Sequence, residues 1–219
     1  MKLKHIKNKL TGSKLKNSRI LWFLSGSACF IISQPLLRLP VLQQLQKSTD
    51  FILFNTLYPK VTGILIALSA GVFEESFRFL FKRFFMKPDK CVFSQPVIFG
   101  LGHGIAEALI ILVPAFSMVH ISQLGTAFLE RFLAIILHVC LTIIVWNGFQ
   151  RNQKILYLIL AVIIHGFVNS MIPLLYPYKN YIIMIESALA FVDILLVIYS
   201  YNSRKYYIKG SSIKDEITI

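Results

Sequence analysis

The sequence predicts an all-α polytopic membrane protein, with about six transmembrane helices around a buried polar site. Its composition is the first reason: of 219 residues, 56% are hydrophobic and 15% are charged, and the mean hydropathy is +0.66. A soluble domain of this length cannot bury so many apolar side chains. The second reason is the pattern, since apolar runs of about 20 residues, long enough to cross a bilayer, alternate with short basic segments.

The apolar runs define the candidate spans in order along the chain. The first, residues 20–41, follows a basic segment, but no clear small-x-small cleavage site follows it, so we interpret it as an uncleaved span. Residues 51–58 either extend the second span or form an interfacial piece. The other candidate spans are residues 59–83, 92–115, 128–148, 155–175 and 181–201.

The distribution of charge predicts the topology. The net charge is +13, and the basic residues gather in an arm at residues 1–19, in the loops 82–91 and 149–154, and in a tail at residues 202–219. The loop 116–127 has no Lys or Arg. If both termini are cytoplasmic, every basic cluster faces the cytoplasm, as the positive-inside rule requires.

The placement of the basic residues also indicates the partners. Because they lie at the ends of spans, we expect them to contact anionic lipid headgroups and not nucleic acid. We expect a multi-pass protein of a cell membrane, of the bacterial cytoplasmic type. The three cysteines, Cys29, Cys91 and Cys140, are far apart and form no CxxC pair. This pattern argues against a disulfide framework and against a thiolate zinc site.

Polar residues recur inside the spans, four residues apart, and such spacing places each pair on one helix face. Ionisable groups inside a membrane are costly and usually have a function or a partner. The histidines lie near the middle of their spans, and the glutamates lie about one helical turn away. We therefore expect one buried site, built from the pairs Glu74 and Arg78, His103 and Glu107, His138 and Thr142, and His165 and Asn169, together with Glu75.

Three further polar residues lie in or near the spans. Glu130 and Arg131 are close to the outer end of the fourth candidate span, and we expect them at the membrane interface. Asp193 is deep in the last candidate span. It either pairs with an inward-facing arginine or lines the site, and the sequence does not decide between these alternatives.

Imidazole and carboxylate groups together allow two routes to hydrolysis. They are ligands for zinc-class ions, beside which a further carboxylate can act as general base. Without metal, a buried glutamate assisted by histidine can activate water directly. Either route would cleave a peptide bond inside the membrane, and both need a cavity that admits water.

Four segments resemble successive motifs of the YhfC family of intramembrane metalloproteases. They are "EESFR" (74–78), "FGLGHGIAEA" (99–108), "ERFLAIILHVCLT" (130–142) and "IIHGFVN" (163–169). That family is grouped with the PrsW proteases and with the CAAX-processing and bacteriocin-processing (CPBP) membrane proteases. The Gly-His-Gly-x-x-Glu form around His103 is the feature most specific to YhfC, and the resemblance covers about residues 55–175.

The resemblance implies a transmembrane protease-like domain over residues 20–201 and assigns roles within it. Glu74 or Glu75 would activate water, and we favour Glu75, with Glu74 paired to Arg78. The histidines would bind a metal ion, Zn²⁺ being the candidate, or stabilise the oxyanion. The implied catalytic residues are Glu74, Glu75, His103, His138 and His165, the three histidines being the implied metal ligands, with Arg78, Glu107 and Asn169 in support.

The function expected from these residues is that of an intramembrane endopeptidase acting on a membrane-associated protein or peptide. One alternative is a proton-coupled transporter that uses the polar residues as a relay, although no inverted repeat or broken helix pair is visible in the sequence. The other alternative is a non-catalytic scaffold or immunity protein that binds a peptide and leaves it whole.

Overall fold

The computed structural model describes residues 19–86, 91–118, 120 and 124–208. The expected basic arm lies outside these residues except for Arg19, as does the tail beyond residue 208. Five of the described helices are long and apolar enough to cross a membrane, and a bent pair counts as a sixth span. The protein is therefore a helical multi-pass membrane protein, and each predicted span coincides with a helix.

The first span is the helix Arg19–Leu45, called here the N-terminal helix, which contains η1 (Ile32–Arg38) and α2 (Leu39–Leu45). A short helix, α3 (Thr49–Leu57), leads from it to α4 (Pro59–Leu80), which η2 (Phe81–Phe85) continues. The remaining helices are α5 (Ser94–Met118), α6 (Gly125–Gln150), α7 (Lys154–Leu175) and α8 (Tyr181–Ser203), with the short η4 (Arg204–Tyr206) after it.

Residues 51–58 do not continue the helix of the second span along the same axis. Residues 51–57 belong to α3, whose axis is bent by 116° from that of the helix over residues 59–85. The break is at Tyr58, whose φ of −132° and ψ of 57° are not helical. The next residue is Pro59, and a proline disfavours helical geometry in the residue before it. The bend therefore has a local cause in the sequence.

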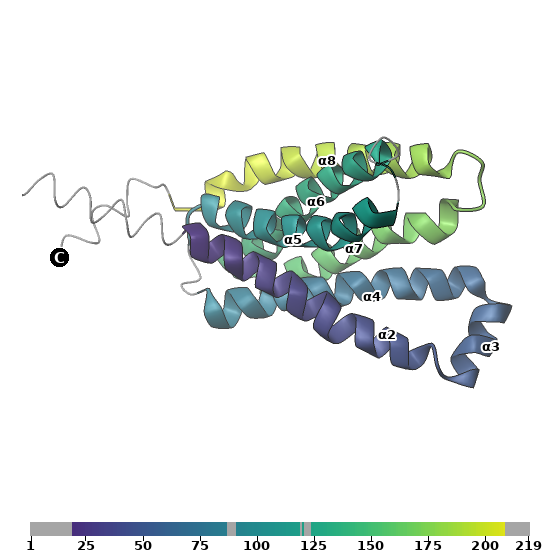
Figure 1. Ribbon diagram of the computed structural model, residues 1–219. Helices are drawn as coiled ribbons and strands as arrows, with labels where there is room; N and C mark the ends of the chain where they lie inside the picture. Colours follow the sequence, from purple (N-terminus) through teal and green to yellow (C-terminus); the bar gives the residue numbers. More distant parts are fainter. Residues whose placement is uncertain (1–18, 87–90, 119, 121–123, 209–219) are drawn as a thin grey trace, which may run out of the picture.

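The spans pack as a bundle in which α4 lies against α7, α5 against α6, and α6 also against α7 and α8 (Figure 1). Both ends of the described chain lie at one end of the bundle, together with η2 and the α6–α7 loop. We call this the basic end, because it carries Arg83, Arg151 and Arg204. The opposite end, which carries α3, is called the α3 end.

Glycines let the backbones of the helices that carry the predicted site residues approach closely. A Cβ atom on Gly71 of α4 would lie 2.9 Å from the carbonyl oxygen of Val162 in α7. A Cβ atom on Gly100 of α5 would lie 2.6 Å from the Cα atom of Val139 in α6. Both contacts leave no room for a side chain, so these glycines set the helix spacing at the depth of the polar residues.

The basic end of the bundle is closed by an aromatic core. The ring of Trp146 in α6 lies 5.6 Å from that of Trp22 and 5.6 Å from that of Phe99. The ammonium of Lys82 lies 4.7 Å from the centre of the Trp146 ring, which compensates the buried cation. Trp146 and Phe99 are fully buried. These rings fill the middle of the described part of the basic end with close apolar contacts.

Candidate active site

The three predicted histidines meet in the middle of the bundle, although they come from α5, α6 and α7. The ring centres of His103 and His138 are 4.9 Å apart, and those of His138 and His165 are 5.4 Å apart. All three side chains are buried, as are Glu74 and Glu75 of α4. The expectation of one buried polar site is therefore confirmed.

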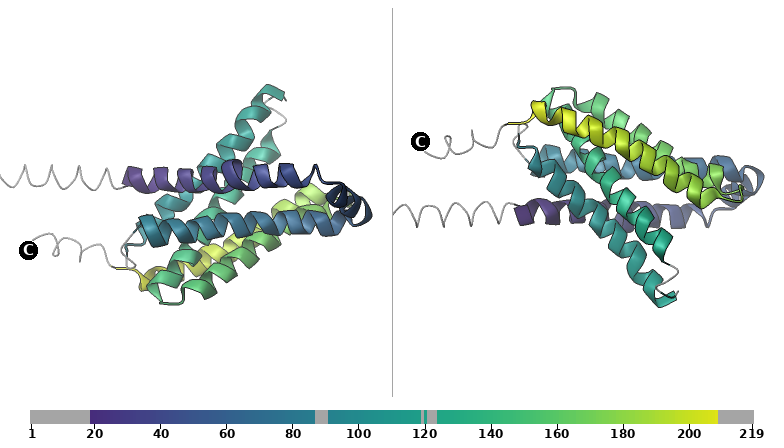
Figure 2. Two further views of the ribbon diagram at one scale, coloured as in Figure 1. Left: turned by 90° about the horizontal axis from the view of Figure 1, so that it is seen from below. Right: turned by 90° about the horizontal axis from the view of Figure 1, so that it is seen from above.

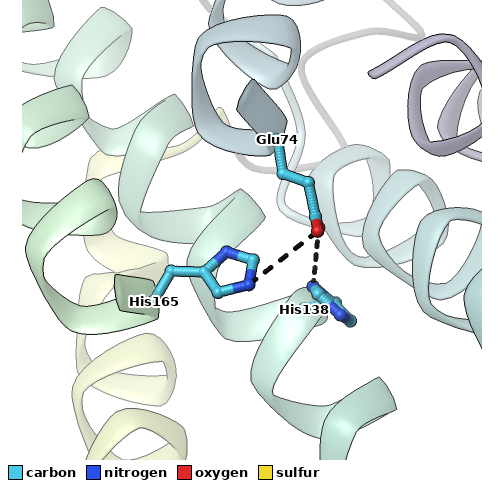
Figure 3. A group of neighbouring side chains, drawn as sticks. All are labelled: Glu74, His138 and His165. Atoms are coloured by element: carbon cyan, nitrogen blue, oxygen red, sulfur yellow. Dashed lines mark ion pairs between the residues drawn. The ribbon is translucent and has the colours of Figure 1, made fainter. Parts of the chain in front are cut away.

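The carboxylate of Glu74 is the centre of this cluster. His103 Nε2 lies 2.8 Å from Glu74 Oε2, and Gln34 of the N-terminal helix donates a hydrogen bond to Oε1. His138 Nδ1 is 3.8 Å from Oε2 and His165 Nε2 is 3.9 Å from Oε1. Figure 3 shows the Glu74 carboxylate pointing between the rings of His138 and His165.

The carboxylate of Glu75 has different neighbours, Arg78 and His165. Arg78 donates a hydrogen bond to Glu75 Oε1, and His165 Nδ1 lies 2.7 Å from the same oxygen. The predicted pair of Glu74 and Arg78 is present, but at the longer distance of 3.6 Å. Arg78 is thus closer to Glu75 than to Glu74, unlike the predicted pairing, and the choice of Glu75 as the residue that activates water stays a prediction.

Glu107 and Arg131 extend the cluster along α5 and α6. Glu107 accepts hydrogen bonds from His138 Nε2 and from Arg131, whose guanidinium lies 3.0 Å from Oε1. The Arg131 side chain is only 11% exposed. The long side chain of Arg131 reaches the half-buried carboxylate of Glu107, so Arg131 belongs to the cluster, and its expected position at the membrane interface stays a prediction.

The hydrogen bonds assign the tautomers of two histidines. Arginine has no acceptor, so His138 Nδ1, which lies 2.6 Å from Arg78, must accept, and Nε2–H donates to Glu107. A carboxylate is an acceptor, so His165 Nδ1–H donates to Glu75. In both rings one nitrogen is held by a carboxylate and the other nitrogen faces the interior of the cluster.

Glu74, His138 and His165 form a group that can hold a metal ion, since one ligand atom from each lies within 4.8 Å of the others. Ligand atoms around a tetrahedral zinc ion, with bonds of about 2.0–2.2 Å, lie about 3.3–3.6 Å apart. The distances of 3.8 Å from His138 to Oε2 and 3.9 Å from His165 to Oε1, which end on different oxygens of Glu74, are slightly longer than this spacing. An ion here would replace the hydrogen bond from Arg78 to His138.

The outer hydrogen bonds of the two imidazoles support this fit. Histidines that bind metal usually donate the other ring N–H to a carboxylate or a carbonyl, which fixes the tautomer. His138 donates to Glu107 and His165 donates to Glu75. The group that can hold a metal ion contains Glu74 and not His103. The resemblance had implied His103 as a ligand, but His103 contacts the Glu74 carboxylate.

A comparison with protein families decides the affiliation. The family model described as YhfC intramembrane metalloprotease matches residues 13–127 and 116–191, which is most of the chain. The chain belongs to the YhfC intramembrane metalloprotease family. No curated protein matches it significantly. The buried Glu, His and His group agrees with the metalloprotease description of the family.

In this YhfC protein a cavity of about 850 Å³ leads from the cluster towards the α3 end. Glu74 and Glu107 line its inner part, and Lys60 and Tyr176 lie at its α3 end. Glu75 and His103 are not in the lining. The polar residues that line the cavity are Gln34, Arg38, Lys60, Glu74, Glu107, Arg131, Asn169 and Tyr176, and the other lining residues are apolar or glycine.

Sequence reasoning missed Gln34 and Arg38, which the N-terminal helix contributes to the YhfC site. Arg38 donates to Gln34 Oε1 at 2.9 Å and to the carbonyl of Ile66 at 2.7 Å, and Gln34 in turn donates to Glu74. A π-helical turn around Pro35 carries both residues. Their spacing of four residues inside an apolar span was the same signal that revealed the other pairs.

Two of the polar residues that the sequence analysis singled out, Asp193 and Thr142, lie outside the cluster. Asp193 is buried, but among the described residues neither of its oxygens has a hydrogen-bond partner, and it does not line the cavity. Neither expected role of Asp193 is thus observed. Thr142 donates to the backbone carbonyl of His138 at 2.7 Å, which is a contact within α6.

Proposed function

We propose that this protein is an intramembrane endopeptidase that hydrolyses a peptide bond of a membrane-associated protein or peptide. The observation that carries the proposal is the position of Glu74, which belongs to the Glu, His and His group and also lines the cavity. A hydrolase needs such a group in contact with space for substrate and water. Membership of the YhfC family supports the same class of reaction.

In the metal-dependent form of this proposal, Glu74, His138 and His165 hold a zinc-class ion. Such an ion supplies Lewis acidity, which lowers the pKa of water to about 7 and polarises a carbonyl. Glu75 and Glu107 keep the two imidazoles oriented through the outer ring nitrogens. Glu107 also lines the cavity, where His138 donates to one of its oxygens and Arg131 to the other.

The same residues permit a metal-independent form. Glu74 then takes the proton from water directly, and His103, which contacts Glu74 Oε2 at 2.8 Å, orients the carboxylate. In both forms Asn169, in the cavity wall, donates a hydrogen bond from its amide to the carbonyl that is attacked. The two forms differ in metal content, which makes them separable by experiment.

The first experiment is to count metal in the purified protein. Zinc, cobalt and iron per chain are measured by mass spectrometry in the wild type, in His138→Ala, and in Thr142→Ala as a control on the same helix. About one ion per chain, lost only in His138→Ala, would support the metal-dependent form. A folded wild type without metal would leave the glutamate-dependent form.

The second experiment tests the reaction itself. Proteoliposomes of the wild type, Glu74→Gln and Glu130→Gln are given a library of quenched fluorescent membrane-spanning peptides. Cleavage by the wild type and by Glu130→Gln, and a fall of at least about 100-fold in Glu74→Gln, is the expected result. Undiminished cleavage by Glu74→Gln would falsify the proposed mechanism, and binding without cleavage by the wild type would favour the scaffold alternative.

A further inference from the structure

The N-terminal helix and α5 touch closely at one level of the bundle. A Cβ atom on Gly26 would lie 1.9 Å from the carbonyl oxygen of Phe99, and one on Gly102 would lie 2.0 Å from that of Phe23. Ser27 Oγ donates to the carbonyl of Gly102 at 2.9 Å. The two backbones are therefore in direct contact here, and no other segment can pass between them.

Beyond this contact the two helices separate towards the α3 end. Figure 2 shows the α5–α6 hairpin crossing the N-terminal helix at an angle, so that their ends on the α3 side point apart. The cavity occupies the region between them: Phe30, Gln34 and Leu39 line it on one side and Glu107 and Ile110 on the other. The lining also includes Ala67, Ala70 and Glu74 of α4.

Exposed apolar residues border the cavity on this side, and the space between residues 30–39 and 107–111 is called here the opening. On the N-terminal helix Leu36 is 61% exposed and Leu39 is 42% exposed, and on α5 Leu109 is 55% exposed and Ile110 is 44% exposed. In a membrane protein such surfaces face hydrocarbon. The opening between residues 30–39 and 107–111 therefore faces lipid, whereas Lys60 and Tyr176 mark the part of the cavity at the membrane surface.

We propose that the opening between the N-terminal helix and α5 admits a membrane-embedded segment of another protein from the lipid, and that this segment is the substrate. The inference rests on the proposed function, because it says how a peptide reaches Glu74. A spanning helix is about 30 Å long. A cavity of about 850 Å³ thus admits only a short unwound stretch of such a helix.

Polar groups in the cavity favour a peptide over a lipid chain as its occupant. The half-buried Asn169 amide lines the cavity, and Arg131 Nε is buried without a hydrogen-bond acceptor among the described residues. An unsatisfied buried polar group costs about 1–3 kcal/mol. An acyl chain cannot form hydrogen bonds with these groups, whereas an unwound peptide backbone offers carbonyl groups to both.

The test is photo-cross-linking in proteoliposomes of Glu74→Gln, which keeps a bound substrate whole. The probe is a synthetic spanning peptide of about 20 apolar residues with a central Gly-Pro pair that eases unwinding. A photoreactive residue replaces Leu39 or Ile110 at the opening, or Ile183 or Phe191 on α8 as controls. The controls are 66% and 64% exposed and do not line the cavity.

We expect at least a fivefold higher yield of cross-linked peptide from the opening than from α8. Equal yields, adducts with lipid alone, or adducts between two copies of this chain would overturn the proposal. A second comparison uses Ala67→Phe, which fills the cavity about two turns from Glu74, against Leu65→Phe on the exposed side of α4. Only Ala67→Phe should lower the yield from the opening.

Failure of this proposal is distinguishable from failure of the proposed function. Cleavage of a short water-soluble peptide by the wild type, without cross-linking at the opening, would keep the endopeptidase and remove access from the lipid. Cross-linking at the opening, without cleavage of any peptide by the wild type, would keep the binding path and remove the endopeptidase.

Discussion

At the scale of single residues, Arg78 connects the two carboxylates of α4 to the histidines. Its guanidinium hydrogen-bonds Glu75, lies 3.6 Å from Glu74, and lies 2.6 Å from His138 Nδ1. The side chain is fully buried. Arg78 is thus the cation that compensates two acidic groups in an apolar bundle, and it does so without lining the cavity.

Replacing Arg78 by methionine should therefore destabilise the folded protein. Breaking a buried ion pair by removing one partner costs about 3–5 kcal/mol, because a charge is left without compensation. The measurement is thermal unfolding in detergent, followed with a thiol-reactive dye that reports exposure of the buried Cys29, Cys91 and Cys140. The control is Arg83→Met, since Arg83 is exposed at the basic end, and an equal loss of stability in both variants would contradict the prediction.

Glu75 and Glu107 accept hydrogen bonds from the ring nitrogens of His165 and His138 that face away from the candidate metal position, so they should affect the affinity for a metal ion. Glu75→Gln and Glu107→Gln keep the shape of each side chain but weaken its hydrogen bond to His165 or His138. Loss of such a partner typically lowers metal affinity about 10–100-fold. Competition with a chelator of known affinity measures the change, and Glu130→Gln, which alters a contact of Arg131 only, should leave it small.

At the scale of elements, the crossing of the N-terminal helix and α5 depends on the absence of side chains at Gly26 and Gly102. The same crossing supplies Gln34 to Glu74, about two helical turns further along the N-terminal helix. A change in the crossing should therefore affect both the stability of the bundle and the geometry of the candidate site.

Gly26→Val should separate these two helices. The new Cβ atom would lie 1.9 Å from a backbone oxygen, which rotamer changes cannot relieve. Overpacking typically costs about 1–3 kcal/mol. We expect a lower unfolding temperature and faster proteolysis of the N-terminal helix in detergent. Gly125→Ala is the control, because a Cβ atom there meets nothing within 4 Å. Unchanged stability of Gly26→Val would show that the helices do not touch at this level.

At the scale of the whole molecule, the bundle is asymmetric along its axis. Aromatic packing around Trp146 closes the basic end, and the cavity runs from the cluster towards the α3 end. The cavity thus offers water a way to the cluster from the α3 end. If the basic end is cytoplasmic, as the positive-inside rule predicts, the candidate active site opens towards the opposite side of the membrane.

This orientation is testable by labelling single cysteines in intact cells with a membrane-impermeant maleimide. Lys47→Cys and Lys179→Cys, at the α3 end, should react from outside, and Arg83→Cys and Lys205→Cys should react only after permeabilisation. The natural cysteines should stay unlabelled because they are buried, and burial raises the pKa of the Cys91 thiol to about 11 against the effect of the Lys82 ammonium. Outside labelling at Arg83→Cys would reverse the predicted topology.

The sequence by itself determined the helical spans and the depth of the polar residues. A bilayer demands apolar runs of a certain length, so the spans could be read from composition, and the helix period placed polar residues on common faces. The meeting of His103, His138 and His165 followed from these two constraints. The break at Tyr58 was also readable, since Pro59 follows it, although the 116° bend was not.

Only the tertiary structure decided which contacts these residues make. Glu74 and Glu75 are adjacent in sequence and lie on faces about 100° apart, so the packing of α4 against α7 settled which one meets the cavity. The contact of Arg131 with Glu107, and the lack of a hydrogen-bond partner for Asp193 among the described residues, depend on side-chain reach and on neighbours from other helices. The pattern of residues along the sequence specifies the helix face and the membrane depth of a side chain. Its contacts with other helices are set by how the helices rotate and cross in the bundle.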